Sequence, residues 1–181
     1  MQGVLFLVLL WLSALNAAFG MGIPQIQYMT QEQFVQQAFG AAKPQWKMLM
    51  LNAELKKTAT DILQHPYRGS RVRYWVDQQR TAWVLDEIGK DLPITIGVVV
   101  NGDKIEQVKI LVYREERGGE VHQDFFTRQF ESVGLNEEER LTRNIDGITG
   151  ATLSVHAVTR TANLVLLLHR YVQAKALAIA D

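Results

Sequence analysis

The 181-residue sequence contains no cysteine. Without a thiol the chain can form no disulfide, and it can supply no thiolate to a zinc ion or an iron–sulfur cluster. It likewise cannot hold a haem through thioether bonds, attach a flavin through sulfur, or use a cysteinyl nucleophile. The absence of cysteine therefore excludes several common classes of redox protein and metalloprotein.

The chain also lacks an excess of charge of either sign, because nineteen basic side chains are balanced by nineteen acidic ones. A dedicated nucleic-acid-binding protein usually carries a basic surplus, so we expect no nucleic-acid partner. The composition, 48% hydrophobic and 21% charged residues, is typical of a globular protein. The length suits one domain of about 150 residues.

The N-terminal residues 1–20 carry no charged side chain and predict a secretory signal peptide. Their apolar run, residues 4–15, is shorter than the roughly 20 residues that span a bilayer. Ala18 and Gly20 give an A-x-G arrangement that suits signal peptidase, so we expect cleavage near Gly20 and, in a bacterium, a periplasmic protein. The alternative is an uncleaved anchor helix over residues 4–23, and only then do we expect membrane association.

The remaining chain predicts an α+β fold, in which an antiparallel β-sheet meander is packed by helices. Residues 21–66 are predicted to form a helical N-terminal segment. Its helices are expected at 31–39, with a capping box from Thr30, and at 53–63, capped by Asn52, with a short strand at 46–51 between them. Four further strands are expected at 71–76, 82–88, 92–100 and 104–113.

Two helices are predicted after the meander. Residues 124–133 contain Phe125, Phe126 and Phe130, which we expect to dock on the sheet as part of the core. The run from residue 151 to about 178 predicts a long C-terminal helix with one apolar face. The four strands before these helices are joined by short turns, including the hairpin signal Asn101–Gly102, which favours an antiparallel meander over an alternating βαβ array.

The loop in front of the long helix reads NIDGITGATLS, residues 144–154, and it has the layout of a phosphate-binding turn. Gly150 lets the backbone approach a ligand closely. The loop opens onto a helix N-terminus, where free N–H groups and the helix dipole favour an anion beside the hydroxyls of Thr149 and Thr152. The simpler interpretation is a plain N-cap, with either threonine capping the helix and Asp146 closing an Asx-turn.

The segment DGITGAT in this loop resembles the D-x-x-[S/T]-G-A-T pattern of the FMN-binding domain family. The family includes the C subunit of the sodium-translocating NADH:quinone oxidoreductase, the G subunit of the Rnf complex and many small exported flavoproteins. Its last pattern threonine carries FMN through a phosphoester bond made by a flavin transferase. The matching positions are Asp146, Thr149, Gly150, Ala151 and Thr152, so the resemblance implies covalent FMN on Thr152.

A second part of the resemblance lies in the loop after the last predicted strand. Glu115 and Gly118 match the family's H-x-E-T-x-G loop, whereas Tyr113 stands in place of His and Glu116 in place of Thr. These departures leave open whether this loop helps to hold the flavin. They do not affect the attachment residue.

The residue patterns and the resemblance together divide the chain into three segments: a signal peptide (1–20), the helical N-terminal segment (21–66) and an FMN-binding domain (67–181), of which only the last is implied by the resemblance. Leu153 and His156 are further candidates to contact the cofactor, because they follow Thr152 on the same helix. For His156, a partly exposed helix histidine without a ligand remains the alternative.

The function implied is that of an exported electron-transfer flavoprotein. Its partners would be a flavin transferase for maturation and other redox proteins, such as a membrane complex or a cytochrome. The chain has no dinucleotide fingerprint, so we expect an electron carrier more than a self-contained oxidoreductase. Two alternatives remain open: a small flavin-dependent reductase acting directly on an acceptor, and a non-redox sensory or assembly module.

Overall fold

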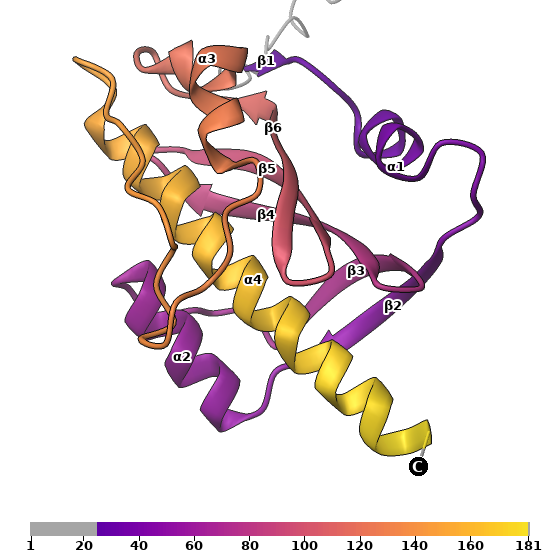
Figure 1. Cartoon of the computed structure of the whole chain (residues 1–181). Helices are drawn as coiled ribbons and strands as arrows, with labels where there is room; N and C mark the ends of the chain where they lie inside the picture. Colours follow the sequence, from indigo (N-terminus) through magenta and orange to yellow (C-terminus); the bar gives the residue numbers. More distant parts are fainter. Residues whose placement is uncertain (1–24, 181) are drawn as a thin grey trace, which may run out of the picture.

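The computed structural model describes residues 25–180, so the predicted signal peptide lies outside the described residues. Its centre is one six-stranded, fully antiparallel sheet with the strand order β1-β6-β5-β4-β3-β2 (Figure 1). The strands are β1 (Ile26–Gln27), β2 (Gln45–Met50), β3 (Arg71–Asp77), β4 (Arg80–Ile88), β5 (Pro93–Asn101) and β6 (Lys104–Tyr113). The predicted α+β meander is therefore confirmed.

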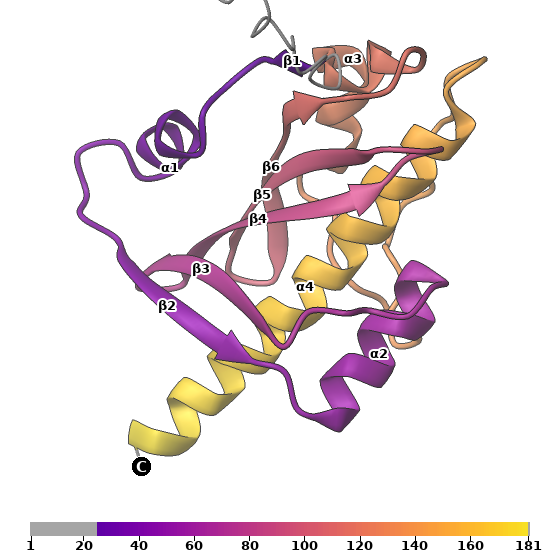
Figure 2. The same ribbon diagram turned by 180° about the vertical axis from the view of Figure 1, so that it is seen from behind.

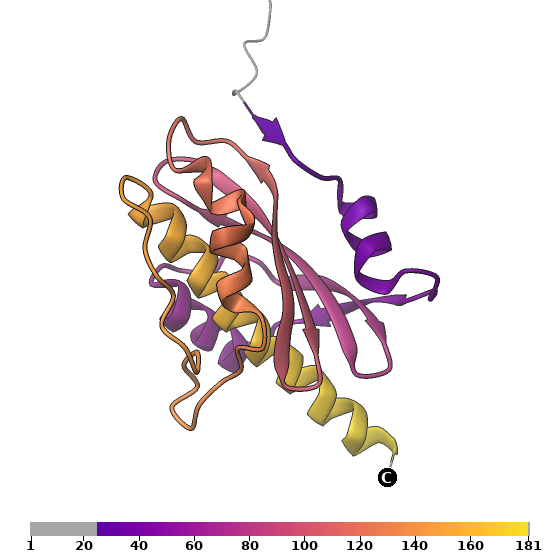
Figure 3. The ribbon, with the colours of Figure 1, turned by 45° about the horizontal axis from the view of Figure 1, so that its top comes forward.

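The helices form a layer on each face of the sheet (Figure 3). One face is covered by α4 (Thr152–Ala180), beside which lies α2 (Ala53–Leu63). The other face is covered by α1 (Gln31–Phe39). The short α3 (Asp124–Thr127) packs against β6. No helix among residues 25–180 combines the length and the apolar composition needed to cross a bilayer.

The N-terminal segment forms strands of the sheet as well as the two predicted helices. Both helices form as expected, α1 with a complete capping box at Thr30 and α2 with the Asn52 side chain accepting the Leu55 N–H. The segment also supplies both edge strands, since β1 pairs with β6 and β2 with β3. Figure 2 shows these two strands at opposite edges of the sheet. The short strand expected at 46–51 forms as β2, whereas β1 was not predicted, so the description of this segment as helical is corrected to two helices and two edge strands.

A glycine in the middle of β5 determines where α1 docks. A Cβ atom at Gly97 would lie 2.7 Å from the ring of Phe34, so only a glycine leaves room for this side chain. Phe34 is fully buried at the centre of a small apolar core between α1 and the sheet. The larger core, on the opposite face, contains Trp83 stacked on Tyr74 with their ring centroids 4.6 Å apart.

The predicted helix over residues 124–133 is only partly correct. The segment forms α3 and then a 3-10 turn, Arg128–Phe130. Phe126 and Phe130 are fully buried and meet edge to face, whereas Phe125 is 58% exposed. Only the residues four apart in the chain face the sheet, because neighbouring residues on one helical turn point in different directions. Phe125 is therefore not a core residue.

A buried polar chain fastens the C-terminal half of α4 to the sheet. His169 Nε2 donates to the carbonyl oxygen of Gly102 at 2.5 Å, so its Nδ1 accepts the Thr81 hydroxyl at 2.7 Å. The Thr81 oxygen in turn accepts the indole N–H of Trp83 at 2.8 Å. Every polar side-chain atom of this hydrogen-bond network thus has a partner. The network requires the neutral form of the His169 imidazole. Burial lowers the pKa of His169 below its ordinary value, although the Gly102 carbonyl and Asp103 partly oppose the effect.

This network predicts a pH-dependent stability. The unfolded chain protonates His169 near its ordinary pKa of 6.5 while the folded chain keeps it neutral. Stability from this group is complete above that pH and falls as the pH drops toward the lower folded value, by up to about 1.4 kcal/mol per pH unit. The variant His169→Gln, which retains a donor and an acceptor, should lose this dependence in thermal unfolding followed between about pH 7.5 and 5.5. His122→Gln is the matched control and should keep it; an unchanged profile in His169→Gln would contradict the assignment.

Candidate functional site

The DGITGAT loop ends at Thr152, which is the first residue of α4 and is exposed at the surface. Ala151 is buried in front of it and has no side-chain group with which to cap the helix. The hydroxyls of Thr149 and Thr152 make no hydrogen bond with any of the residues 25–180. The plain N-cap interpretation of these two threonines is therefore wrong, and the hydroxyl of Thr152 remains available.

The uncapped start of α4 leaves backbone donors beside this hydroxyl. The first helical hydrogen bond runs from the N–H of Val155 to the carbonyl of Ala151. Within the described part of the chain, the N–H groups of Thr152 and Leu153 have no acceptor. Helix N-termini in this state carry a partial positive charge, which favours a phosphate group. The donor set therefore fits a phosphoester on Thr152.

One glutamine holds the loop from the side. Gln129 accepts the N–H of Asp146 through Oε1 at 2.7 Å, and its own backbone carbonyl accepts the Arg143 guanidinium at 3.3 Å. Gln129 lies on the 3-10 turn after α3, so the packing of Phe126 and Phe130 also positions the loop. Sequence reasoning missed Gln129, because an isolated glutamine far from the motif carries no local signal.

The loop after β6 packs directly on the first turn of α4. The Tyr113 hydroxyl donates to the carbonyl of Arg117 and accepts the hydroxyl of Ser154, whose Oγ lies 2.9 Å away. Gly118 has a φ of +88°, and a Cβ there would lie 2.9 Å from both the Tyr113 and Ser154 oxygens. Burial raises the pKa of Tyr113, against the effect of the Ser154 hydrogen bond, so the phenol stays protonated. The departure from the family pattern at Tyr113 thus supplies a contact to the first turn of α4.

Glu115, the matching residue of that loop, organises a neighbouring turn. Its Oε1 accepts the backbone N–H groups of Lys90, Asp91 and Leu92 at 2.6, 2.7 and 2.8 Å. A carboxylate with three such donors is strongly held and has little capacity left for a ligand. We therefore assign Glu115 a structural role in this loop.

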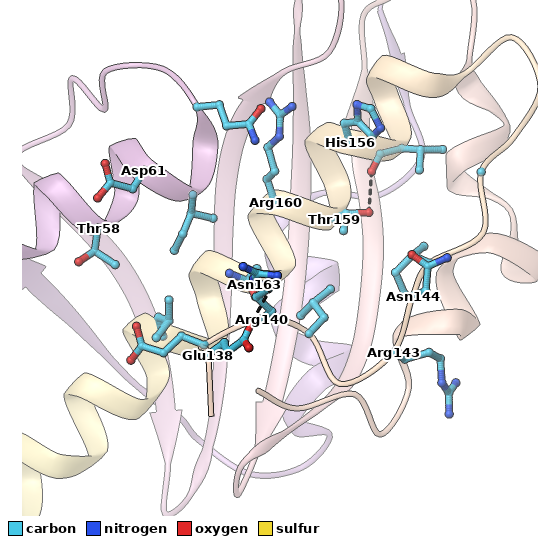
Figure 4. A pocket seen from close by; sticks show the side chains of 18 of the residues that line it. Thr58, Asp61, Glu138, Arg140, Arg143, Asn144, His156, Thr159, Arg160 and Asn163 are labelled. Atoms are coloured by element: carbon cyan, nitrogen blue, oxygen red, sulfur yellow. Dashed lines mark hydrogen bonds and ion pairs between the residues drawn. The ribbon is translucent and has the colours of Figure 1, made fainter. Parts of the chain in front are cut away.

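Two cavities flank Thr152, which lies on the wall of both. The larger, of about 960 Å³, lies between α2, the loop 138–147 and one side of α4. Figure 4 shows Thr58 and Asp61 of α2 at one side of this cavity and Thr159 and Asn163 of α4 at the other. The smaller, of about 660 Å³, is formed by the loops 90–92 and 115–117 and by residues 150–154. Both volumes lie in the range typical of small-molecule and cofactor sites.

The larger cavity contains an unsatisfied polar atom. Asn163 Oδ1 is buried and has no hydrogen-bond partner among the described residues. Nearby, the Arg160 guanidinium donates to the carbonyl of Leu63 at the end of α2. Beyond Arg160, the buried carboxylate of Glu87 accepts from His65 Nε2 at 2.7 Å. Burial raises the pKa of Glu87, while the hydrogen bond and charge of His65 and the charge of Arg160 oppose the rise.

The structure brings some of the predicted site residues together and separates others. His156 is exposed and lines the larger cavity, on the same face of α4 as Thr152. Leu153 is 49% exposed and lines the smaller cavity, together with Gly150 and Ala151. Two further residues, Thr149 and Asp146, lie in neither cavity. Residues 25–180 contain no group of acidic or histidine side chains arranged to hold a metal ion.

The contact between Tyr113 and Ser154 predicts a coupled loss of stability. Tyr113→Phe leaves the buried Ser154 hydroxyl without its acceptor and should lower the free energy of unfolding by about 1–2 kcal/mol. Ser154→Ala in the Tyr113→Phe background should then add little, which a double-mutant cycle in urea would measure. Tyr171→Phe, on α4 away from this loop, is the control and should change stability less. Additive losses would show that the two hydroxyls act independently.

Comparison with known sequences bears on the same region. Residues 89–166 match the FMN-binding domain family. No curated protein matches the chain. The matched region runs from just before β5 into α4 and includes the loop 144–150 and Thr152, but it excludes α1, α2 and four of the strands, β1–β4. Residues 89–166 therefore match an FMN-binding domain, which supports a flavoprotein.

Proposed function

We propose that the protein is an exported electron carrier whose FMN is bound covalently, through a phosphoester, to the hydroxyl of Thr152. The observation that carries the proposal is the state of this hydroxyl. It is exposed, makes no hydrogen bond to any of residues 25–180, and stands at the uncapped start of α4 inside a D-x-x-T-G-A-T segment. Of the two threonines in the segment, Thr152 alone borders both large cavities.

Attachment needs a transferase and a flavin donor with a phosphoanhydride bond. The Thr152 Oγ1–phosphorus bond forms, the anhydride bond of the donor breaks, and the hydroxyl proton leaves with the nucleotide leaving group. In the folded chain, the N–H groups of the first turn and the helix dipole stabilise the remaining negative charge on the phosphoryl oxygens. Bound FMN supplies the redox chemistry, and the protein positions it and tunes its potential.

An electron carrier fits the placement of this residue. Thr152 lies at the surface, so a cofactor attached there is within reach of a partner protein. Outside the cytoplasm free FMN is scarce, and a covalent bond prevents its loss. The signal-like residues 1–20 support export, and the lack of cysteine is compatible with a linkage that needs no thiol.

Flavin attachment can be tested directly. When the full chain is coexpressed with a flavin transferase and then denatured, flavin absorbance should stay with the polypeptide, and its intact mass should increase by one FMN less one water. Thr152→Ala should abolish both signals, because the acceptor oxygen is gone. Thr149→Ala, which removes the other hydroxyl of the segment, is the matched control and should retain them. The same mass measurement shows whether the chain has been cleaved near Gly20.

Two results would contradict this assignment. Flavin retained by Thr152→Ala would move the attachment to another residue. A chain that stays colourless with an active transferase would favour the non-redox alternative.

The carrier role predicts a specific kinetic behaviour. The purified flavinylated protein, reduced chemically and mixed with a one-electron acceptor protein such as a cytochrome, should be reoxidised in a single turnover. It should show no sustained oxidation of nicotinamide cofactors, because the sequence contains no dinucleotide fingerprint. Stopped-flow absorbance of the flavin would measure the first, and steady-state assays the second. Multiple turnovers on a small acceptor by the protein alone would favour the reductase alternative.

A further inference from the structure

We propose that the isoalloxazine ring of the FMN on Thr152 occupies the larger cavity, between α2 and α4, where Asn163 Oδ1 accepts the N3–H of the ring. This inference rests on the proposed attachment to Thr152 and adds where the ring lies. It assigns a cofactor-binding role to Asn163 and to α2, neither of which belongs to the sequence motif.

The larger cavity extends in the direction a tethered group needs. It begins at Thr152 and runs along one side of α4 past His156 and Thr159 to Asn163 and Leu167. Asn163 lies about three helical turns beyond Thr152, or roughly 16 Å along the axis at 1.5 Å per residue. The smaller cavity, by contrast, contacts α4 only in its first turn, at residues 152–154. The larger cavity, on the α2 side, is therefore long enough for an extended ribityl chain and ring, whereas the smaller cavity contacts much less of α4.

The polar chemistry of the larger cavity matches one edge of the ring. Asn163 Oδ1 is an acceptor that the protein itself leaves without a donor. Buried acceptors are costly when unpaired, so an unpaired one on a cavity wall indicates a donor supplied from outside. The N3–H of an isoalloxazine is such a donor. Arg160, on the preceding turn, adds a positive charge to the same cavity, where its guanidinium donates to the Leu63 carbonyl.

The smaller cavity has fewer free polar groups and a less favourable charge for binding the ring. Its main carboxylate, Glu115, is already saturated by three backbone N–H groups. Its charged lining has three carboxylates, Asp91, Glu115 and Glu116, against the two cations Lys90 and Arg117. A net negative lining disfavours a phosphate-linked flavin that gains electrons. The larger cavity has three arginines against three carboxylates, besides His156.

The apolar walls of the larger cavity come from three separate parts of the chain. Ile62 on α2, Leu141 in the loop and Val155 on α4 all belong to, or pack against, the main hydrophobic core. Because α2 lies outside the matched residues 89–166, this chain completes the ring site with its own N-terminal segment. A flat ring between apolar side chains, with a few polar groups at its edge, is the usual form of a cofactor pocket.

The absence of cysteine allows a direct test, because a single introduced thiol is unique in the chain. Asp61→Cys places it on the α2 wall of the larger cavity, and Asp91→Cys places it in the smaller cavity. Both positions are exposed aspartates, so the two variants are matched. Each is prepared with and without the coexpressed transferase, and the labelling rate of its thiol by a bulky maleimide is measured. A ring that occupies the larger cavity nine-tenths of the time should slow labelling at position 61 about tenfold and leave position 91 unchanged.

A second variant tests the acceptor. Asn163→Leu removes the unpaired oxygen, so the flavin-free protein should unfold at an equal or higher temperature than the unmodified chain. In the flavinylated protein the same variant should weaken the visible circular dichroism of the flavin and shift its midpoint potential. Thr161→Val, whose hydroxyl bonds to its own helix at the Ala157 carbonyl and which lies outside the lining of this cavity, is the control and should do neither.

The outcomes separate the ring position from the attachment itself. Covalent flavin that protects position 91 instead of 61, or an Asn163→Leu protein with unchanged circular dichroism and potential, would overturn the ring position while leaving the phosphoester intact. Loss of covalent flavin from the unmodified chain would overturn the attachment.

Discussion

The burial of α4 against the sheet is the constraint on which the rest of the structure depends. Its apolar face closes the main core, so the helix can neither slide nor rotate without exposing that face to water. Two polar contacts fix its position: Ser154 bonds to Tyr113 at the N-terminal end, and His169 bonds to Thr81 and Gly102 farther along. Thr152, the first residue of this helix, is therefore held at a defined place by contacts in which its own side chain takes no part.

Much of the fold follows from signals that act over a few residues. The capping box at Thr30 and the Asn52 cap form as expected. The turn between β5 and β6 forms at Gly102, which has a φ of +63°. Features that depend on distant residues were missed. The two-residue strand β1 exists only because β6 is available to pair with it. A register shift in the β5–β6 pairing lets Ile105 and Val108 face the same core, although strict alternation would place them on opposite sides of the sheet.

The candidate site also combines features that have a local sequence signal with features that depend on distant residues. The motif identified Thr152 and the start of the helix, because both are local. The cavity wall on α2, the unpaired oxygen of Asn163 and the brace from Gln129 come from residues far from the motif in the chain, and each has an unremarkable sequence context. The lack of cysteine, which excluded thiol-linked cofactors, places no restriction on a threonine-linked one.

The packing of α2 beside α4 has a consequence for the order in which the protein matures. One wall of the larger cavity is made near the beginning of the described chain and the other close to its end. Synthesis proceeds from the N-terminus, so the nascent protein has no such cavity until its last helix has emerged and folded back across the sheet. At the proposed ring position, the flavin can enter only after α4 has folded across the sheet beside α2. Fragments that lack either helix cannot form this cavity.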